Sequence, residues 1–157
     1  MADDKLENNK KIVRRMLEAF NTGDTKVVEE LIAPNIRDVA NLHGFEEHER
    51  RMPVPQRVQT EIMLGKQAFP DKKFKVESII AEGDTVILRW SMTGTHTGTL
   101  FGRKATGKKV KVSGTEIVRI KDGKIVEHDD DGVHTLQLLQ QLGWLDAKMR
   151  RKVGIEE

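Results

Sequence analysis

The run that ends in acidic residues holds the side chains best suited to chemistry in this chain. Residues 124–131 read Lys-Ile-Val-Glu-His-Asp-Asp-Asp, and alternation along a strand would place His128 and Asp130 on one face. An imidazole and a carboxylate so arranged can serve general acid–base catalysis. In the alternative interpretation the strand simply ends in solvent. In either case we expect Asp129 and Asp131 to be hydrated or to cap the next helix.

Glu116 is the second candidate, because it shares a predicted strand face with the apolar residues Val110, Val112, Val118 and Ile120. A buried carboxylate without a partner is costly or becomes neutral. A hairpin closed at residues 122–123 pairs positions whose numbers sum to about 245, which places Glu116 opposite Asp129. If Glu116 meets His128 and Asp130 there, the three form a carboxylate–imidazole–carboxylate cluster. In the alternative, Glu116 sits at a bulge and points to solvent.

Other residues could line the cavity that such a cluster would need. His96 extends the strand face that carries Trp90, and both are predicted to lie in the cavity wall. Asp38 and His43 belong to a polar segment that could also enter the cavity. The alternative for each of these two histidines is an ordinary loop or surface position.

The motifs that the chain lacks narrow the chemistry further. It has no cysteine, which excludes disulfides and thiolate metal sites. The histidines and acids follow no metal-ligand spacing, and no phosphate-binding glycine loop or Gly-x-Ser-x-Gly run occurs. The simplest enzymatic interpretation is acid–base catalysis without a covalent intermediate.

The hydrophobic pattern predicts the elements that position these residues. Helical spacing predicts three N-terminal helices. Their core candidates are Ile12, Val13, Met16, Leu17 and Phe20; then Val27, Val28, Leu31 and Ile32; and then Val58, Ile62, Met63 and Leu64. Gly23 should end the first helix, and residues 33–35 should end the second.

From Phe74 onward the period is two, which predicts strands over residues 74–80, 86–92, 110–120 and 124–130, followed by a final helix that Gly143 closes. Ile80 should share the inner face of the first strand with Phe74. The order predicts an α+β fold, in which a curved antiparallel sheet forms a cone or barrel closed by the N-terminal helices. We expect residues 1–157 to form one domain, with a core over 9–143 and a polar tail over 145–157.

Composition limits the partners. The 157 residues carry a formal charge of +2 and 4% aromatic residues, which gives no argument for nucleic-acid binding. No apolar run approaches the roughly 20 residues that cross a membrane, and the N-terminus lacks the apolar stretch of a secretory signal. We therefore expect a cytoplasmic protein that binds neither nucleic acid nor membrane.

Several stretches together resemble the SnoaL-like polyketide cyclases, a family of the nuclear transport factor two-like superfamily. These stretches are residues 14–23 (Arg-Arg-Met-Leu-Glu-Ala-Phe-Asn-Thr-Gly), Thr95 to Gly98, the loop 102–109, the hairpin 122–125 that leads to His128 and Asp130, and residues 138–143. The resemblance implies an oligomeric α+β cone. It also implies ring closure of an aromatic polyketide by intramolecular aldol condensation, without metal or cofactor.

The resemblance also implies roles for individual residues. The catalytic aspartate of the family falls on Asp130 and a nearby histidine on His128. Glu116 takes a cavity position where the cyclases carry histidine, and Asp38 takes that of a cavity asparagine. The chain departs from the family at residues 131–132, Asp-Gly, where the cyclases tend to have an aromatic residue. It also lacks the tyrosines that would help to grip a flat polycyclic substrate.

The hypothesis is thus an acid–base enzyme acting on a small hydrophobic carbonyl compound, in which Asp130 removes a proton next to a carbonyl. The alternatives are a ligand-binding or scaffold protein of the same fold, or another hydrolase or isomerase of the superfamily. A homodimer or homotetramer is expected through an apolar outer sheet face formed by Ile79, Ile87 and Ile117.

Overall fold

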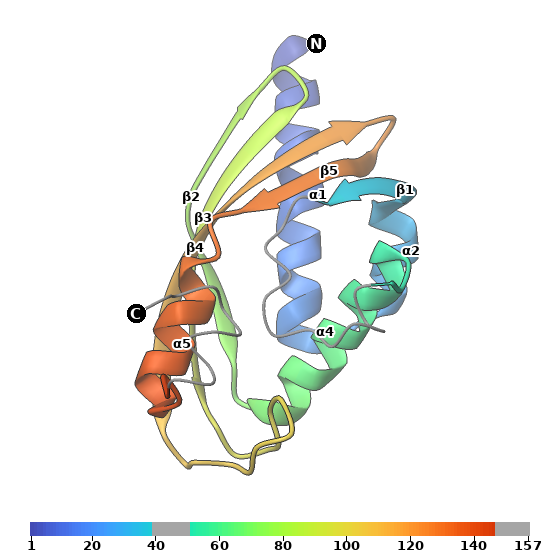
Figure 1. Cartoon of the computed structure of the whole chain (residues 1–157). Coiled ribbons are helices and arrows are strands. Elements are labelled where there is room, and N and C mark those ends of the chain that lie inside the picture. Colours follow the sequence, from blue (N-terminus) through green and yellow to red (C-terminus); the bar gives the residue numbers. More distant parts are fainter. Residues whose placement is uncertain (39–50, 147–157) are drawn as a thin grey trace.

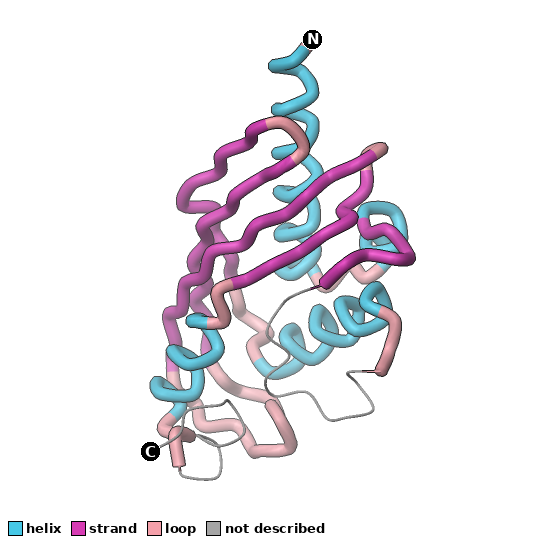
Figure 2. Tube along the Cα trace, turned by 45° about the horizontal axis from the view of Figure 1, so that its top comes forward, coloured by secondary structure: helices cyan, strands magenta, loops and turns pink. Residues whose placement is uncertain are grey.

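The structure, a computed structural model, describes residues 1–38 and 51–146. In chain order the elements are α1 (Ala2–Thr22), α2 (Lys26–Leu31), β1 (Ile32–Asp38), α4 (Val54–Ala68), β2 (Lys73–Glu82), β3 (Thr85–Thr95), β4 (Lys109–Lys121), β5 (Lys124–Asp130) and α5 (Val133–Leu142). The helices α1 and α4 lie on the same side of a twisted sheet (Figure 1, Figure 2), and we call the face that they cover the inner face.

The first helix forms and ends as its sequence predicts. Val13, Met16 and Leu17 are buried along one stripe of α1, as expected for an amphipathic helix. Gly23 closes the helix at φ 82°, and its N–H donates to the carbonyl oxygen of Ala19. Glycine adopts this left-handed conformation without the steric cost of a side chain.

The predicted α+β fold, a curved sheet covered by the N-terminal helices, is confirmed, with one difference in detail: the sheet is mixed and open rather than all antiparallel and closed. Its order is β1-β5-β4-β3-β2, and the outermost strand β1 runs parallel to β5. Residues 33–35, predicted to end the second helix, lie in β1, which begins at Ile32 directly after α2. Because β1 joins the edge of the sheet rather than the meander, the alternation of the later strands gave no sign of it.

A bulge in β2 reverses the faces predicted for two isoleucines. The register with β3 shifts between Val76 and Ser78, so that Ile79 pairs with the buried Leu88. A bulge inserts one extra residue and exchanges the faces of all residues beyond it. Ile80, expected inside, is therefore 64% exposed, and it replaces Ile79 in the apolar outer stripe.

The apolar positions of α4 were only partly predicted. Ile62 is completely buried, whereas Met63 is 62% and Leu64 44% exposed. The helix instead buries Arg57. Three consecutive apolar residues span almost a full helical turn, so they cannot all face one core.

The last helix protects an open strand edge. Strand β5 pairs with β4 only from Glu116 to Lys121, and α5 packs beside the rest of β4. The Gln137 Oε1 accepts from the Ser113 N–H at 2.9 Å, and the Gln141 amide exchanges two hydrogen bonds of 2.7 Å with the Lys111 backbone. Side-chain amides thus take the place of a neighbouring strand.

The core is continuous between the helices and the inner face. Its fully buried side chains include Val28, Ile62, Val86, Leu88, Ile120 and Leu139. Trp144, two residues beyond α5, also belongs to it. Within the described ranges, no helix is both long and apolar enough to cross a bilayer.

Candidate functional site

Glu116 lies on the inner face of β4 and is held there by Trp90. The Trp90 Nε1–H donates to Glu116 Oε1 at 2.8 Å. Gly114 gives the indole room, because a Cβ at that position would lie 2.6 Å from Trp90 Cζ2. Trp90 itself is 4% exposed. The glutamate therefore points inward, and the alternative in which it turns to solvent is excluded.

His128 and Asp130 reach the same place from β5. Asp130 pairs with Glu116 and His128 with Val118, one position from the register predicted for this hairpin, which had Asp129 opposite Glu116. Directly paired residues share a face. The His128 Nε2 lies 3.6 Å from Glu116 Oε2. The structure thus brings Glu116, His128 and Asp130 together; we call them the acid–base cluster.

A bulge explains the one-residue difference. The register shifts between Arg119 and Ile120, and Ile125 pairs with Ile120 while Glu127 pairs with Arg119. The extra residue, Val126, turns Ile125 to the inner face together with His128. Strict alternation would have separated them.

The surroundings of Asp130 suit a proton acceptor. Burial raises the pKa of the Asp130 carboxyl, and the nearby carboxylate of Glu116 raises it further. His134, the Gly132 N–H and His128 act in the opposite direction. A carboxyl whose pKa lies above its ordinary value is a stronger base than a free aspartate.

His134, near the start of α5, is a site residue that the sequence analysis missed. Its ring lies 5.2 Å from the Trp90 ring, centre to centre, and its Nδ1 is sealed from solvent with no hydrogen-bond partner among the described residues. The available signal was its position four residues after Asp130, beyond the Asp131-Gly132 turn. Strand alternation does not extend to His134, because the residue lies in α5 and not in β5.

Three residues at this strand end could offer ligand atoms to a cation. In the described part of the chain, Asp130, Asp131 and His134 place one such atom each within 4.8 Å of the others. The carboxylates already accept backbone N–H groups, however: Asp130 Oδ1 from Gly132 at 2.6 Å, and Asp131 from Val133 and Thr115. These bonds order the turn that leads into α5, whose N-cap residue is Gly132 and not Asp131.

His96 lies in another part of the molecule. It follows Trp90 by six residues, directly after the end of β3, which is about 20 Å of extended chain, and it is completely buried. Its Nδ1 accepts the Thr106 N–H at 3.1 Å, while its ring contacts Phe69 and Trp144. Burial lowers the pKa of His96. This histidine anchors the loop before β4 and does not join the acid–base cluster.

Asp38 and His43, the other two residues predicted to line the cavity, lie partly or wholly outside the described part of the chain. The backbone of Asp38 pairs with that of His128 across β1 and β5, so the strand places it beside the acid–base cluster, but its side chain lies outside the described part. His43 lies outside the described residues altogether.

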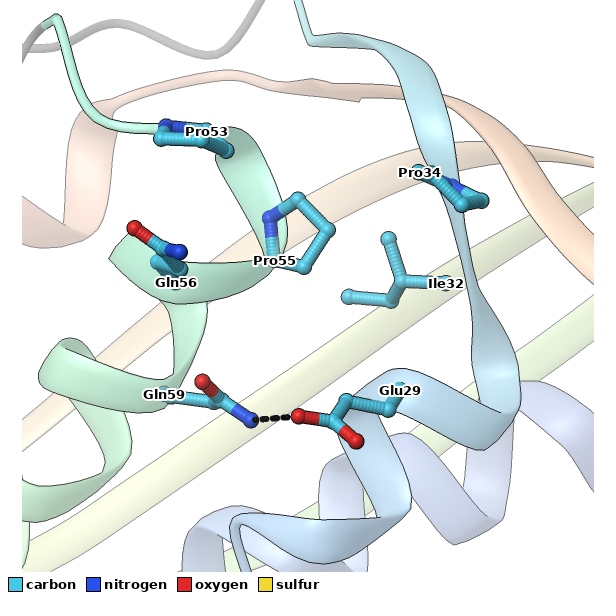
Figure 3. A pocket seen from close by; sticks show the side chains of 7 residues that line it. All are labelled: Glu29, Ile32, Pro34, Pro53, Pro55, Gln56 and Gln59. Atoms are coloured by element: carbon cyan, nitrogen blue, oxygen red, sulfur yellow. Dashed lines mark hydrogen bonds between the residues drawn. The ribbon is translucent and has the colours of Figure 1, made fainter.

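An open pocket of about 270 Å³ lies elsewhere, between α2, β1 and the start of α4 (Figure 3). It is lined by Glu29, Ile32, Pro34, Pro53, Pro55, Gln56 and Gln59. The Gln59 Nε2 donates to Glu29 Oε1 at 3.4 Å. Among the described residues, none of the predicted site residues lines this pocket, and Glu29 is the one ionisable side chain in its wall, which is too little for acid–base catalysis.

Comparison with known proteins agrees with this geometry. The family model described as SnoaL-like polyketide cyclase matches residues 10–142. Two curated relatives are named aklanonic acid methyl ester cyclases. DauD from Streptomyces sp. (strain C5) is 34% identical over 76% of this chain and 72% of its own length. DnrD from Streptomyces peucetius is 33% identical over 76% and 80%.

Solved structures show the same architecture. AclR, a candidate hydroxylase from Streptomyces galilaeus, superposes with a TM-score of 0.71 at 30% identity over 89% of this chain and 83% of its own. IdmH, a candidate polyketide cyclase from Streptomyces antibioticus, gives 0.70 at 28% identity over 86% and 98%.

Proposed function

The chain belongs to the SnoaL-like polyketide cyclase family, and on that premise we propose that it cyclises a hydrophobic polycarbonyl compound with Asp130 as the acid–base residue. The observation that carries the proposal is the convergence of Asp130, Glu116 and His128 on the inner face. The two curated relatives, which are named as cyclases of aklanonic acid methyl ester, make that compound the first substrate to test.

The proposed step is an intramolecular aldol addition. Asp130 Oδ1 is engaged by the Gly132 N–H, which leaves Oδ2 to remove a proton from a carbon next to a carbonyl. The resulting enolate carbon forms a bond to a second carbonyl carbon of the same molecule. The new alkoxide then takes the proton back from Asp130. Atoms and electrons balance within the substrate, so the step requires no cofactor.

The neighbours of Asp130 have separate roles in this proposal. Trp90 fixes the Glu116 carboxylate, and Glu116 in turn faces His128 Nε2. His128 is thereby held beside the base, where its N–H can donate to the enolate oxygen as negative charge develops. Donors placed in advance at such an oxygen contribute strongly to catalysis. His134 flanks Asp130 from α5.

The test compares Asp130→Asn with Asp129→Asn, an exposed neighbour that pairs with the outward-facing Ile117. We expect Asp130→Asn to lower kcat by about 10²–10⁴-fold and Asp129→Asn to leave it unchanged. Cyclised product would be followed by chromatography, with hydroxylated product monitored in the same runs because AclR is a candidate hydroxylase. Wild-type turnover by Asp130→Asn would refute the mechanism.

Thermal unfolding of the same variants shows whether the fold is intact. Because the folded-state pKa of Asp130 is raised, the native state binds its proton more tightly than the unfolded chain does. The ionised side chain therefore destabilises the fold at neutral pH, and its replacement by asparagine removes this cost. We expect the midpoint of Asp130→Asn to equal or exceed that of the wild type.

We also propose that a second copy of the chain covers the outer sheet face. Ile80, Ile87 and Ile117 lie side by side on β2, β3 and β4 and are 64%, 41% and 47% exposed. Contiguous exposed apolar residues of this kind mark interaction surfaces. Light scattering should give at least a dimer for the wild type and a monomer for Ile87→Asp. A monomeric wild type at micromolar concentration would contradict this proposal.

The remaining expectations stay predictions: a small hydrophobic carbonyl-containing ligand and no affinity for nucleic acid or membranes, which binding assays on the purified protein would test, and a cytoplasmic location. Cell fractionation would decide the last of these.

A further inference from the structure

The aldol step at Asp130 develops negative charge on two oxygen atoms of the ligand in turn. The first is the enolate oxygen, for which His128 is the donor beside the base. The second is the new alkoxide, which forms on another carbonyl and must lie within reach of Asp130, because Asp130 returns the proton to it. A second hydrogen-bond donor near Asp130 would stabilise this oxygen.

His134 approaches Asp130 from a different element. His128 lies on β5, whereas His134 lies near the start of α5. One ring nitrogen of His134 lies within 4.8 Å of an Asp130 carboxylate oxygen. A single oxygen atom fits between the two groups, because two hydrogen bonds of about 2.8 Å span up to about 5.6 Å. Burial raises the pKa of Asp130, and His134 acts against this effect more strongly than His128 does.

The two nitrogens of the His134 ring have different surroundings. Nδ1 is sealed from solvent, and no described residue bonds to it. Nε2 is not among the sealed atoms, and the residue as a whole is only partly buried. A buried N–H without an acceptor is rarer in proteins than a buried acceptor without a donor. The proton of the neutral ring therefore belongs on Nε2, from where it can be donated to a ligand.

Packing alone does not account for a histidine at this position. The His134 ring contacts the Trp90 ring at 5.2 Å, and phenylalanine would make the same contact without a sealed polar atom, which costs free energy. The neighbouring site is open to a ligand, because the side chains of Glu116 and His128 are 24% and 27% exposed. A function for Nε2 would offset the cost of Nδ1.

We propose that His134 Nε2–H donates a hydrogen bond to the second carbonyl oxygen of the ligand, the one that becomes the alkoxide. This inference rests on the proposed function, since it concerns the second half of the same reaction. Asp130 removes and returns the proton, His128 donates to the enolate oxygen, and His134 holds the carbonyl that is attacked. No proton leaves His134, so the balance of the step is unchanged. The ligand is accordingly a dicarbonyl compound whose two oxygens both lie beside Asp130.

The experiment compares His134→Phe, which keeps a ring but has no N–H, with His134→Gln, which keeps an N–H donor. With the substrate of the Asp130 test, His134→Phe should lower kcat by about 10²-fold, and His134→Gln should be about tenfold faster than His134→Phe. Gln140→Leu, at an exposed position of the same helix, should leave kcat unchanged. The unfolding midpoint of His134→Phe should equal or exceed that of the wild type, because the sealed Nδ1 is removed.

Deuterium exchange separates the two halves of the reaction. In D₂O, His134→Phe should still form the enolate and return it to substrate, so the recovered substrate should gain deuterium faster than without protein, as mass spectrometry measures. Asp130→Asn should neither exchange nor cyclise. Full cyclisation by His134→Phe, or loss of its exchange together with its cyclisation, would overturn the role of His134 and leave that of Asp130 intact. Wild-type exchange and cyclisation by Asp130→Asn would instead refute the proposed function, and a wild type that does not cyclise the substrate would refute both.

Discussion

Two histidines on the inner face, His96 and His128, have opposite surroundings. His96 is fully buried, with its Nδ1 occupied by the Thr106 N–H. The side chain of His128 is 27% exposed and faces the Glu116 carboxylate. Proton transfer needs an ionisable partner and a route for the proton to solvent. His128 has both, whereas the described partner of the His96 ring is the non-ionisable Thr106 and the ring is enclosed. Depth in the fold therefore separates a histidine that holds structure from one that can do chemistry.

The largest expected effect is on stability at His96. His96→Ala removes a buried ring and the acceptor of the Thr106 N–H, which should lower the free energy of unfolding by about 3 kcal/mol. His128→Ala, at a partly exposed position, should lower it by less than about 1 kcal/mol while reducing turnover. Urea unfolding and the cyclisation assay measure the two quantities. If His96→Ala proved as stable as His128→Ala, the contrast would be wrong.

A smaller effect is expected from pH. The pKa of His96 is lowered in the folded state, so below about pH 6.5, the ordinary pKa of histidine, the unfolded chain takes up a proton that the native protein rejects. The contribution of neutral His96 is complete above that pH and is lost as the pH falls. Unfolding midpoints from pH 8 to pH 5 should decline less steeply in His96→Gln. Parallel curves would argue that His96 does not titrate in this way.

The smallest effect is expected at Trp90. Trp90→Phe keeps a ring against Phe74 and His134 but removes the N–H that donates to Glu116. The loss of one hydrogen bond to a charged group should cost about 1–2 kcal/mol in stability. It should also lower kcat modestly, because Glu116 and His128 are less firmly placed. An unchanged kcat would restrict the role of Trp90 to packing.

The sequence predicted the helical stripe of α1, its end at Gly23 and the meeting of Glu116 with His128 and Asp130, because these follow from local periodicity and from one hairpin turn. It failed where an extra residue shifts the phase. The bulge in β2 exchanged Ile79 and Ile80, and the bulge in β5 moved Ile125 inward. Bulges depend on the partner strand, which no single-strand pattern contains.

Other features could not be predicted because they depend on contacts between segments that are far apart in the sequence. The parallel pairing of β1 with β5 joins residues about 90 positions apart in the chain, and neither strand indicates it alone. His134 reaches the site only because α5 starts directly after β5 and turns back toward Trp90.

The early end of β5 has a consequence for engineering the protein. Strand β4 continues from Glu116 down to Lys109 without β5, and the amides of Gln137 and Gln141 bond to it instead. Asp130 is thus the last strand residue at an internal gap of the sheet, rather than at its rim. The place of the Asp130 carboxylate therefore depends on the length of β5 as well as on the presence of an aspartate at this position. Inserting two residues between Asp130 and Asp131 would leave every residue of the acid–base cluster in place but would move α5, which carries His134. A loop graft at this point should therefore keep the number of residues between Asp130 and the start of α5 at Val133.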